Sequence, residues 1–285
     1  MIPNASPSAV TEKVISMKGL KFTYDGGVQA IRDIDLDIRY GEYLALVGGN
    51  GSGKTTLAKN INGLLRPTSG SVVVAGRPTN KQKVAALARI VGYAFQNPDH
   101  QLFCSSVEDE IRFGPMNLGY SEQDVRDKVE KAIEAMSLEQ LRKIPPLSLR
   151  LGERRRVSIA SVIAMDPDVL ILDEPTTGLD AEESAELMRR LKRLNDDGKT
   201  IMLITHDMKL VAEHAKRVVV ISEGRVLLDS DPRGAFSDLE ILRQSNLVPP
   251  AVTQLAHRLS AFDIPRDVIS PEELVFHLLK ARGGA

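Results

Sequence analysis

Hydrophobic and polar residues alternate with a period of two near the start of the chain. In the segment IRDIDLDIR at residues 31–39, Ile34, Leu36 and Ile38 fall on one face and aspartates fall on the other. The segment KGLKFTY at residues 18–24 alternates in the same way. Alternation of this kind is typical of strands with one buried face. Both segments are therefore predicted to be antiparallel strands.

Farther along, the pattern changes to continuous apolar runs that are separated by segments with helical spacing. Continuous apolar runs predict strands buried on both faces. Strands are predicted at 43–48, 71–76, 89–95, 168–174 and 200–206, with a hairpin at 217–230. Helices are predicted at 57–65, 125–136, 152–165 and 182–194, and again from about residue 235. This alternation of strands and helices predicts an α/β fold.

Composition narrows the class of protein without identifying it. Of 285 residues, 42% are hydrophobic, which allows one large domain or two smaller ones. Lys+Arg total 37 and Asp+Glu 38, so the net charge of −1 gives no sign of a general affinity for nucleic acid. The apolar runs are far shorter than the roughly 20 residues of a spanning helix. The Pro- and Ser-rich tail at residues 1–12 has no signal-peptide pattern, so a cytoplasmic chain is expected.

A glycine-rich segment follows the strand expected at 43–48. It reads GGNGSGKT, satisfies the pattern GxxxxGK[ST] and precedes a predicted helix, which is the context this phosphate-binding motif requires. Glycines let backbone N–H groups turn toward phosphate oxygens, and the helix adds its positive end. Lys54 is expected to reach the β- and γ-phosphates of ATP, and Thr55 to bind Mg²⁺. The predicted phosphate loop comprises Gly48, Gly49, Asn50, Gly51, Ser52, Gly53, Lys54, Thr55 and Thr56.

Two carboxylates end the buried strand VLILDE. Because the strand carries Asp173 to the mouth of the sheet, this residue is expected to hold Mg²⁺. Glu174 would then lie beside the γ-phosphate and polarise the attacking water. On its own the pair could simply cap a strand; together with the phosphate loop it indicates an ATPase.

Taken together, these residues resemble the ATP-binding-cassette (ABC) ATPases over most of the chain. Gln96, after VGYAF, matches the family's Q-loop, which contacts Mg²⁺ and the attacking water and senses the transmembrane partner. His206 in LITHD matches the switch histidine near the γ-phosphate, and Tyr24 matches the aromatic residue that stacks on adenine. TTGLD matches the D-loop, with Gly178, Leu179 and Asp180. The resemblance implies catalytic roles for Glu174, His206, Gln96 and Lys54, and metal contacts for Thr55, Gln96 and Asp173.

Three further segments are similar to ATPase subunits of energy-coupling-factor importers, which include cobalt, nickel and vitamin systems. They are QNPDHQLF at 96–103, VEDEIRFGPMNLG at 107–119 and LRQSNLVPPAVTQLAHRL at 242–259. In that family the segment after the Q-loop lies where the transmembrane protein docks. Leu102 and Phe103 could serve that docking or pack in the core. The resemblance implies a peripheral place on the cytoplasmic face of the cell membrane. It also implies a second ABC ATPase subunit, a transmembrane coupling protein and a separate substrate-binding membrane protein.

The family signature, LSGGQ or LSGGE, is altered in this chain. Its place is taken by Leu149, Arg150, Leu151, Gly152 and Glu153, unless two inserted residues make Leu147-Ser148 the remnant. In the family the signature contacts the partner subunit's ATP, and Leu151 is expected to crowd that approach. The basic run that follows, Arg154 to Arg156, is interpreted as a solvated helix face with one or two salt bridges.

The altered signature is compatible with two kinds of dimer. In an asymmetric heterodimer, a partner with a complete signature serves this chain's intact phosphate loop, whereas a homodimer would tolerate the change at a reduced rate. The predicted architecture is an ABC-type P-loop domain at 1–234 with an antiparallel β subdomain and an inserted helical subdomain at about 97–165. A small helical extension follows at 235–285. A cassette subunit of another ABC transporter type and a soluble nucleotide-gated clamp are the alternatives.

Overall fold

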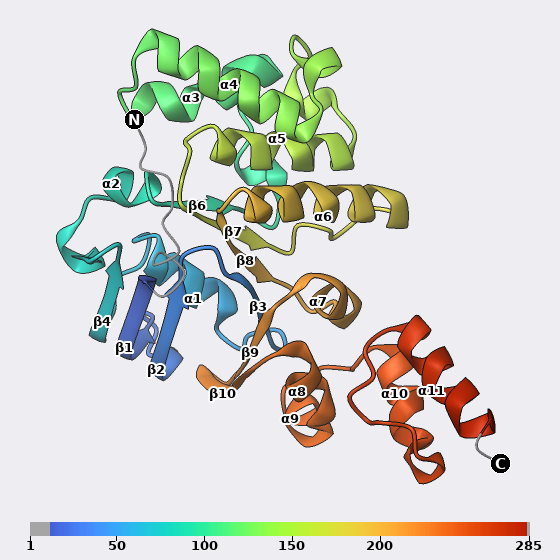
Figure 1. The fold of residues 1–285 in the computed structure, drawn as a ribbon. Helices are drawn as coiled ribbons and strands as arrows, with labels where there is room; N and C mark the ends of the chain where they lie inside the picture. Colours follow the sequence, from blue (N-terminus) through green and yellow to red (C-terminus); the bar gives the residue numbers. More distant parts are fainter. Residues whose placement is uncertain (1–11, 284–285) are drawn as a thin grey trace.

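The structure, a computed structural model, describes residues 12–283 and consists of two β-sheets and the helices around them (Figure 1). The tail expected at residues 1–12 lies outside the described residues except for Glu12. The expected α/β fold is confirmed, since both sheets carry helices between their strands.

The smaller sheet is antiparallel and has the strand order β2-β1-β4-β5. Its strands are β1 (Lys13–Thr23), β2 (Gln29–Arg39), β4 (Ser69–Val74) and β5 (Arg77–Pro78). β1 and β2 are the two alternating segments of the sequence, and β1 begins five residues earlier than predicted. Ile34, Leu36 and Ile38 are buried on one face, as their alternation requires.

The larger sheet has the order β10-β9-β3-β8-β7-β6. Neighbouring strands from β9 to β6 are parallel, and β10 pairs antiparallel with β9 as the predicted hairpin. The bounds are β3 (Tyr43–Val47), β6 (Val91–Ala94), β7 (Val169–Asp173), β8 (Thr200–Ile204), β9 (Arg217–Ser222) and β10 (Arg225–Ser230). Every residue of β3, β7 and β8 is buried, which explains their continuous apolar runs.

Alternate residues of the parallel strands face two different cores. Val169 and Ile171 of β7 pack with α1 and the small sheet, whereas Leu170 and Leu172 pack with the helices on the other side. Because β3 and β7 are parallel and separated only by β8, their carboxyl ends meet at one edge of the sheet. Ligands of open parallel sheets bind at that edge.

Most of the predicted helices are present, with bounds shifted by up to four residues. They are α1 (Lys54–Ile61), α4 (Glu122–Met136), α5 (Leu151–Ile163) and α6 (Ala181–Asp196). The sequence did not predict α2 (Val84–Ala88), α3 (Val107–Asn117) or α7 (Met208–His214). Helices α3, α4 and α5 pack together above the larger sheet (Figure 1). Short 3₁₀ turns occupy Thr79–Lys81, Pro98–His100, Glu139–Leu141, Pro146–Ser148 and Ser260–Phe262.

The end of the chain is helical, as expected. Helices α8 (Pro232–Ser237) and α9 (Leu239–Gln244) pack under β9 through Phe236 and Leu242. Helices α10 (Ala251–Arg258) and α11 (Pro271–Gly283) form a separate small core, built on Ala256, Ile264, Val268 and Leu274. Among residues 12–283, no helix has both the length and the apolar character of a membrane span.

Candidate functional site

The phosphate loop is folded so tightly that two of its glycines could not be replaced by residues that carry a side chain. A Cβ on Gly53, whose φ is +106°, would lie 2.6 Å from the carbonyl oxygen of Ala30. A Cβ on Gly48 would overlap the carbonyl oxygen of Ile221. These two glycines therefore allow the loop to approach the backbone of Ala30 in β2 and of Ile221 in β9.

Lys54 turns back into the loop that precedes it. Its Nζ donates to the carbonyl oxygens of Gly48 at 2.8 Å and Gly49 at 2.9 Å, and lies 3.3 Å from Ser52 Oγ. Burial lowers the pKa of the Lys54 ammonium, and the nearby Glu174 and Asp173 carboxylates oppose that shift. The cation is thus held at the centre of the loop, where phosphate oxygens can replace the two carbonyls.

Asp173 accepts two hydroxyl hydrogen bonds on the same oxygen. Thr55 Oγ1 donates to Oδ2 at 2.9 Å, and Tyr93 OH donates to it at 2.7 Å. Burial, followed by the charge of Asp173, raises the pKa of the Tyr93 phenol, so the tyrosine stays neutral and donates. A hydroxyl beside a carboxylate supplies the oxygen ligands that Mg²⁺ prefers, so these residues fit the ion expected here.

Sequence reasoning missed Tyr93. The tyrosine lies on β6, beside the strand that ends in Asp173. Its position in a buried strand was a signal that its hydroxyl needs a partner, because buried phenols are usually hydrogen-bonded. The partner itself depends on which strands are neighbours, and the sequence did not predict the strand order.

Glu174 is held between two side chains that follow β8. His206 Nδ1 lies 2.6 Å from Oε1, and Thr205 Oγ1 donates to Oε2 at 3.3 Å. The glutamate side chain is only 11% exposed and that of the histidine is 67% exposed. The pair therefore consists of a buried carboxylate and an exposed imidazole. Glu174 has φ of +48°, a conformation that costs energy outside glycine and is often retained at functional sites.

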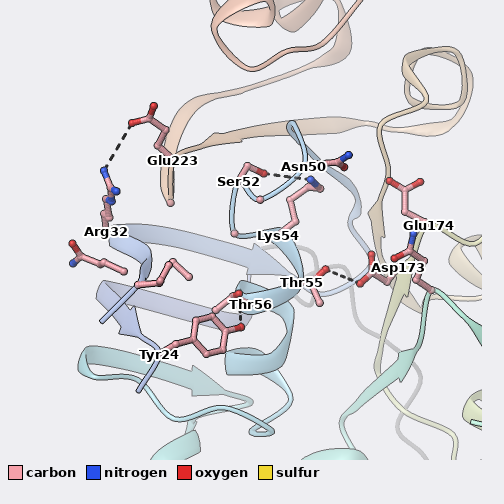
Figure 2. Close-up of a pocket in the computed structure, with 17 residues that line it drawn as sticks. Tyr24, Arg32, Asn50, Ser52, Lys54, Thr55, Thr56, Asp173, Glu174 and Glu223 are labelled. Carbon is pink, nitrogen blue, oxygen red and sulfur yellow. Dashed lines mark hydrogen bonds and ion pairs between the residues drawn. The ribbon is translucent and has the colours of Figure 1, made fainter. Parts of the chain in front are cut away.

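One cavity of about 640 Å³ contacts most of the predicted nucleotide-binding residues (Figure 2). Its walls include Tyr24, Gln96, Asp173, Glu174 and the loop residues from Asn50 to Thr56. Tyr24 follows β1, is 41% exposed, and its hydroxyl lies 2.9 Å from Thr56 Oγ1. The far wall holds an ion pair that the sequence did not predict, Arg32 with Glu223 at 3.8 Å. The predicted residues Gly48, Gly49 and His206 do not line the cavity, but Gly48 and Gly49 contact Lys54 and His206 contacts Glu174.

The altered signature lies away from this cavity. Leu149 to Glu153 lead into α5, and Gly178 to Asp180 precede α6; neither segment lines the cavity. Arg150 is the N-terminal cap residue of α5, and its N–H donates to Glu153 Oε2 at 3.0 Å. The side chain of Leu151 packs against Gly178 of the same chain.

The interpretation of Arg154 to Arg156 as a solvated face is wrong for Arg155. Arg154 pairs with Asp99 at 2.8 Å, but Arg155 is 3% exposed. Its guanidinium donates to the carbonyl oxygens of Phe95 and Gln96, and reaches that of Thr177 at 3.5 Å. Successive helical residues point in different directions, so a run of three arginines cannot share one face. Burial lowers the pKa of Arg155, and the carboxylates of Asp173 and Asp99 oppose that shift.

The segment after Gln96 is divided between core and surface. Leu102 is buried in the core, whereas Phe103 is 62% exposed. The ring of Phe103 lies edge-to-face on that of Phe113, with centroids 4.8 Å apart. The exposed Met116 lies on α3 as well. Phe103, Phe113 and Met116, here called the apolar patch, are large hydrophobic side chains that the fold leaves exposed.

Comparisons with known proteins identify the family to which the chain belongs. The family model described as "ABC transporter" matches residues 31–177. A putative ABC transporter ATP-binding protein from Caldanaerobacter subterraneus subsp. tengcongensis is 45% identical over 262 residues, covering 92% of this chain but 45% of the relative. This chain thus spans about half the length of that relative. It also spans about half the length of two relatives from Methanosarcina species.

Shorter relatives match over nearly their whole length. The energy-coupling factor transporter ATP-binding protein EcfA from Methanocaldococcus jannaschii is 39% identical, with 88% of this chain and 90% of the relative covered. The structure of cbiO1 from Clostridium perfringens, described as part of the transporter complex cbiONQ, is 36% identical. Its TM-score is 0.75, covering 87% of this chain and 99% of that one. A dimeric ATP-binding cassette bound to ADP and Pi is 27% identical, with a TM-score of 0.70 and coverage of 77% and 99%. The chain belongs to the ABC transporter family of ATPases, as its phosphate loop and carboxylate pair predicted.

Proposed function

We propose that this chain is the ATP-hydrolysing subunit of an energy-coupling-factor-type membrane importer. The observation that carries the proposal is the placement of Glu174, paired with His206, across one cavity from the phosphate loop. The names of the relatives, which include energy-coupling factor ATP-binding proteins at 36–39% identity, support the choice of transporter.

The cavity residues that the sequence singled out are assigned the following roles. The backbone donors of the phosphate loop and Lys54 bind the phosphates of ATP, and Tyr24 stacks on the adenine. Thr55, Asp173 and Gln96 would hold Mg²⁺, which would neutralise charge on the phosphates. Glu174 orients the water and accepts its proton, while His206 fixes the carboxylate and reaches the γ-phosphate.

The apolar patch is the proposed docking surface for a transmembrane coupling protein. Glu110, which is 3% exposed, accepts the N–H groups of Phe103 and Cys104, each at 2.8 Å. These bonds fix the backbone that presents Phe103, and Arg155 fixes Gln96 a few residues earlier. A movement of the docked partner would therefore be transmitted to Gln96 through the segment 96–103, whose two ends are held by these hydrogen bonds.

The proposed enzyme is a heterodimer at the cytoplasmic face of the membrane. The phosphate loop, Asp173 and Glu174 of this chain are complete, whereas its signature lacks the serine and the first glycine. A non-identical ABC ATPase subunit with a complete signature would complete this chain's site. A separate membrane protein would bind the transported substrate.

The docking proposal is tested by co-expression with a candidate coupling protein and second ATPase. The variant Phe103→Ser/Phe113→Ser should lose co-purification with the membrane complex but keep ATP binding. Phe262→Ser is the matched control, because Phe262 is 67% exposed in the C-terminal extension. If the wild-type chain never associates with membranes under these conditions, a soluble nucleotide-gated clamp becomes the better account.

A further inference from the structure

The leucine that replaces the first glycine of the signature contacts the D-loop of its own chain. Gly178 has φ of +81°, and a Cβ at that position would lie 2.6 Å from Leu151 Cδ2. The end of the leucine side chain therefore occupies the space that the missing Cβ leaves. A side chain at residue 178 would require the end of the Leu151 side chain to shift.

Two neighbouring positions on α5 contact the same segment. One turn after Leu151, Arg155 Nη2 reaches the carbonyl oxygen of Thr177 at 3.5 Å. A Cβ on Gly152 would overlap the carboxylate of Glu183, which accepts the N–H of Asp180 at 3.4 Å. The start of α5 thus contacts residues 177 to 183 at three points, and Leu151 provides the apolar one.

The segment that Leu151 contacts is hydrogen-bonded to the catalytic strand end. The N–H of Thr177 donates to the carbonyl oxygen of Glu174 at 3.2 Å, and that of Leu179 donates to Thr176 at 3.1 Å. Gly178 lies between these two bonds. A displacement of Gly178 would therefore pass through Thr177 to Glu174, whose own φ is positive and depends on its surroundings.

We propose that Leu151 is a positioning residue, which packs into the space above Gly178 and thereby holds the D-loop and Glu174 of its own chain in the hydrolytic geometry. The departure from the signature would then contribute to hydrolysis at this chain's own site, besides its effect on the partner's nucleotide. The inference rests on the proposed ATPase function and adds a contact partner for the altered signature.

A double-mutant cycle tests the contact, with variants Leu151→Ala, Gly178→Ala and the two combined. Leu151→Ala should lower kcat about fivefold and leave KM for ATP unchanged, since it misplaces Glu174 without touching the cavity. Gly178→Ala should lower kcat about tenfold because its Cβ displaces the leucine. In the Leu151→Ala background the same Cβ has room, so Gly178→Ala should cost no more than about twofold. Backbone strain at φ +81° is present in both backgrounds and cancels.

Two further variants separate positioning from general loss of structure. Leu151→Met should retain near-normal kcat, because methionine fills a similar volume. Leu279→Ala is the matched control, since Leu279 is 64% exposed on α11 and should leave kcat unchanged. Amide hydrogen exchange at residues 176–180 should be about tenfold faster in Leu151→Ala.

Additive effects on kcat, or unchanged exchange at 176–180 in Leu151→Ala, would overturn the proposal. Because exchange is measured without ATP turnover, it also tests the Leu151 contact if the wild-type chain hydrolyses no ATP even when mixed with a partner that has a complete signature. In that case faster exchange would support the contact, and only the proposed function would fail.

Discussion

Tyr93 donates its phenolic hydrogen to Asp173 Oδ2 over 2.7 Å, from a neighbouring strand of the parallel sheet. Thr55 donates to the same oxygen from the start of α1. The carboxylate that is proposed to hold Mg²⁺ is thereby fixed from two sides, and one of these supports, Tyr93, lies outside the motifs identified from the sequence. Residues that orient metal ligands commonly tune metal affinity.

Tyr93→Phe should weaken the response to Mg²⁺. The variant keeps the ring but removes the hydroxyl, so Asp173 loses one of its two orienting bonds. We expect the Mg²⁺ concentration at half-maximal ATPase activity to rise about tenfold. Tyr43→Phe is the matched control, because the buried Tyr43 hydroxyl has no hydrogen-bond partner within residues 12–283. Equal effects of the two variants would show that Tyr93 does not orient the metal ligand.

Lys54 should make ATP affinity sensitive to alkaline pH. Burial lowers the pKa of its ammonium, so the charge is lost at a lower pH than in an ordinary lysine. The affinity for ATP should therefore begin to fall below the ordinary lysine pKa of about 10.4. Fluorescent-nucleotide titrations across alkaline pH would measure this, and a flat profile would contradict it. Lys54→Ala should weaken binding at every pH, whereas Lys81→Ala, at an exposed position, should not.

The lowered pKa of Lys54 also makes the free energy of unfolding depend on pH. The unfolded chain binds more protons than the folded chain between the lowered and the ordinary pKa of Lys54. The contribution of this group to the free energy of unfolding therefore rises with pH across that window. Bound phosphates favour the ammonium, so ATP should reduce this rise. Chemical denaturation with and without ATP across the window would measure the difference.

Arg150→Ser should stabilise the chain. Arg150 occupies the N-cap of α5 with extended dihedral angles, and its side chain supplies no cap acceptor. Serine would accept a first-turn N–H and complete a capping box with Glu153, a gain of about 1 kcal/mol. Thermal unfolding should shift up by about 2 °C. Arg150→Ala removes the same charge without adding a cap, so the idea fails if alanine stabilises as much as serine.

The strands and the phosphate loop could be predicted from the sequence because they are determined by residues that are close together along the chain. Alternation fixes the buried face of β2, and the motif fixes the turn between β3 and α1. The contacts that were missed join distant parts of the chain. Tyr93 and Asp173 are 80 positions apart, and Arg155 reaches Gln96 across 59. Helical spacing did carry a signal for Arg155, since it shares a face with the buried Gly152, Ile159 and Val162.

The altered signature shows a second limit of motif comparison. From the sequence, Leu151 is a substitution whose side chain crowds a partner's nucleotide. In the structure its side chain lies against Gly178, a residue 27 positions later whose lack of a side chain makes the contact possible. Matching one motif at a time cannot reveal such a pair, because each member has meaning only beside the other.

In the proposed dimer, Glu174 of this chain activates the water that attacks ATP, and the partner supplies the complete signature. The most direct measurement compares the ATPase rates of wild-type, Glu174→Gln and Glu182→Gln chains, each alone and mixed with a candidate partner. Glu182 lies on the exposed start of α6 and serves as the matched control. The account predicts that mixing raises the rate for wild type and Glu182→Gln, and that Glu174→Gln lowers it about a hundredfold while ATP still binds. A mixture that hydrolyses ATP equally well with Glu174→Gln would contradict the account.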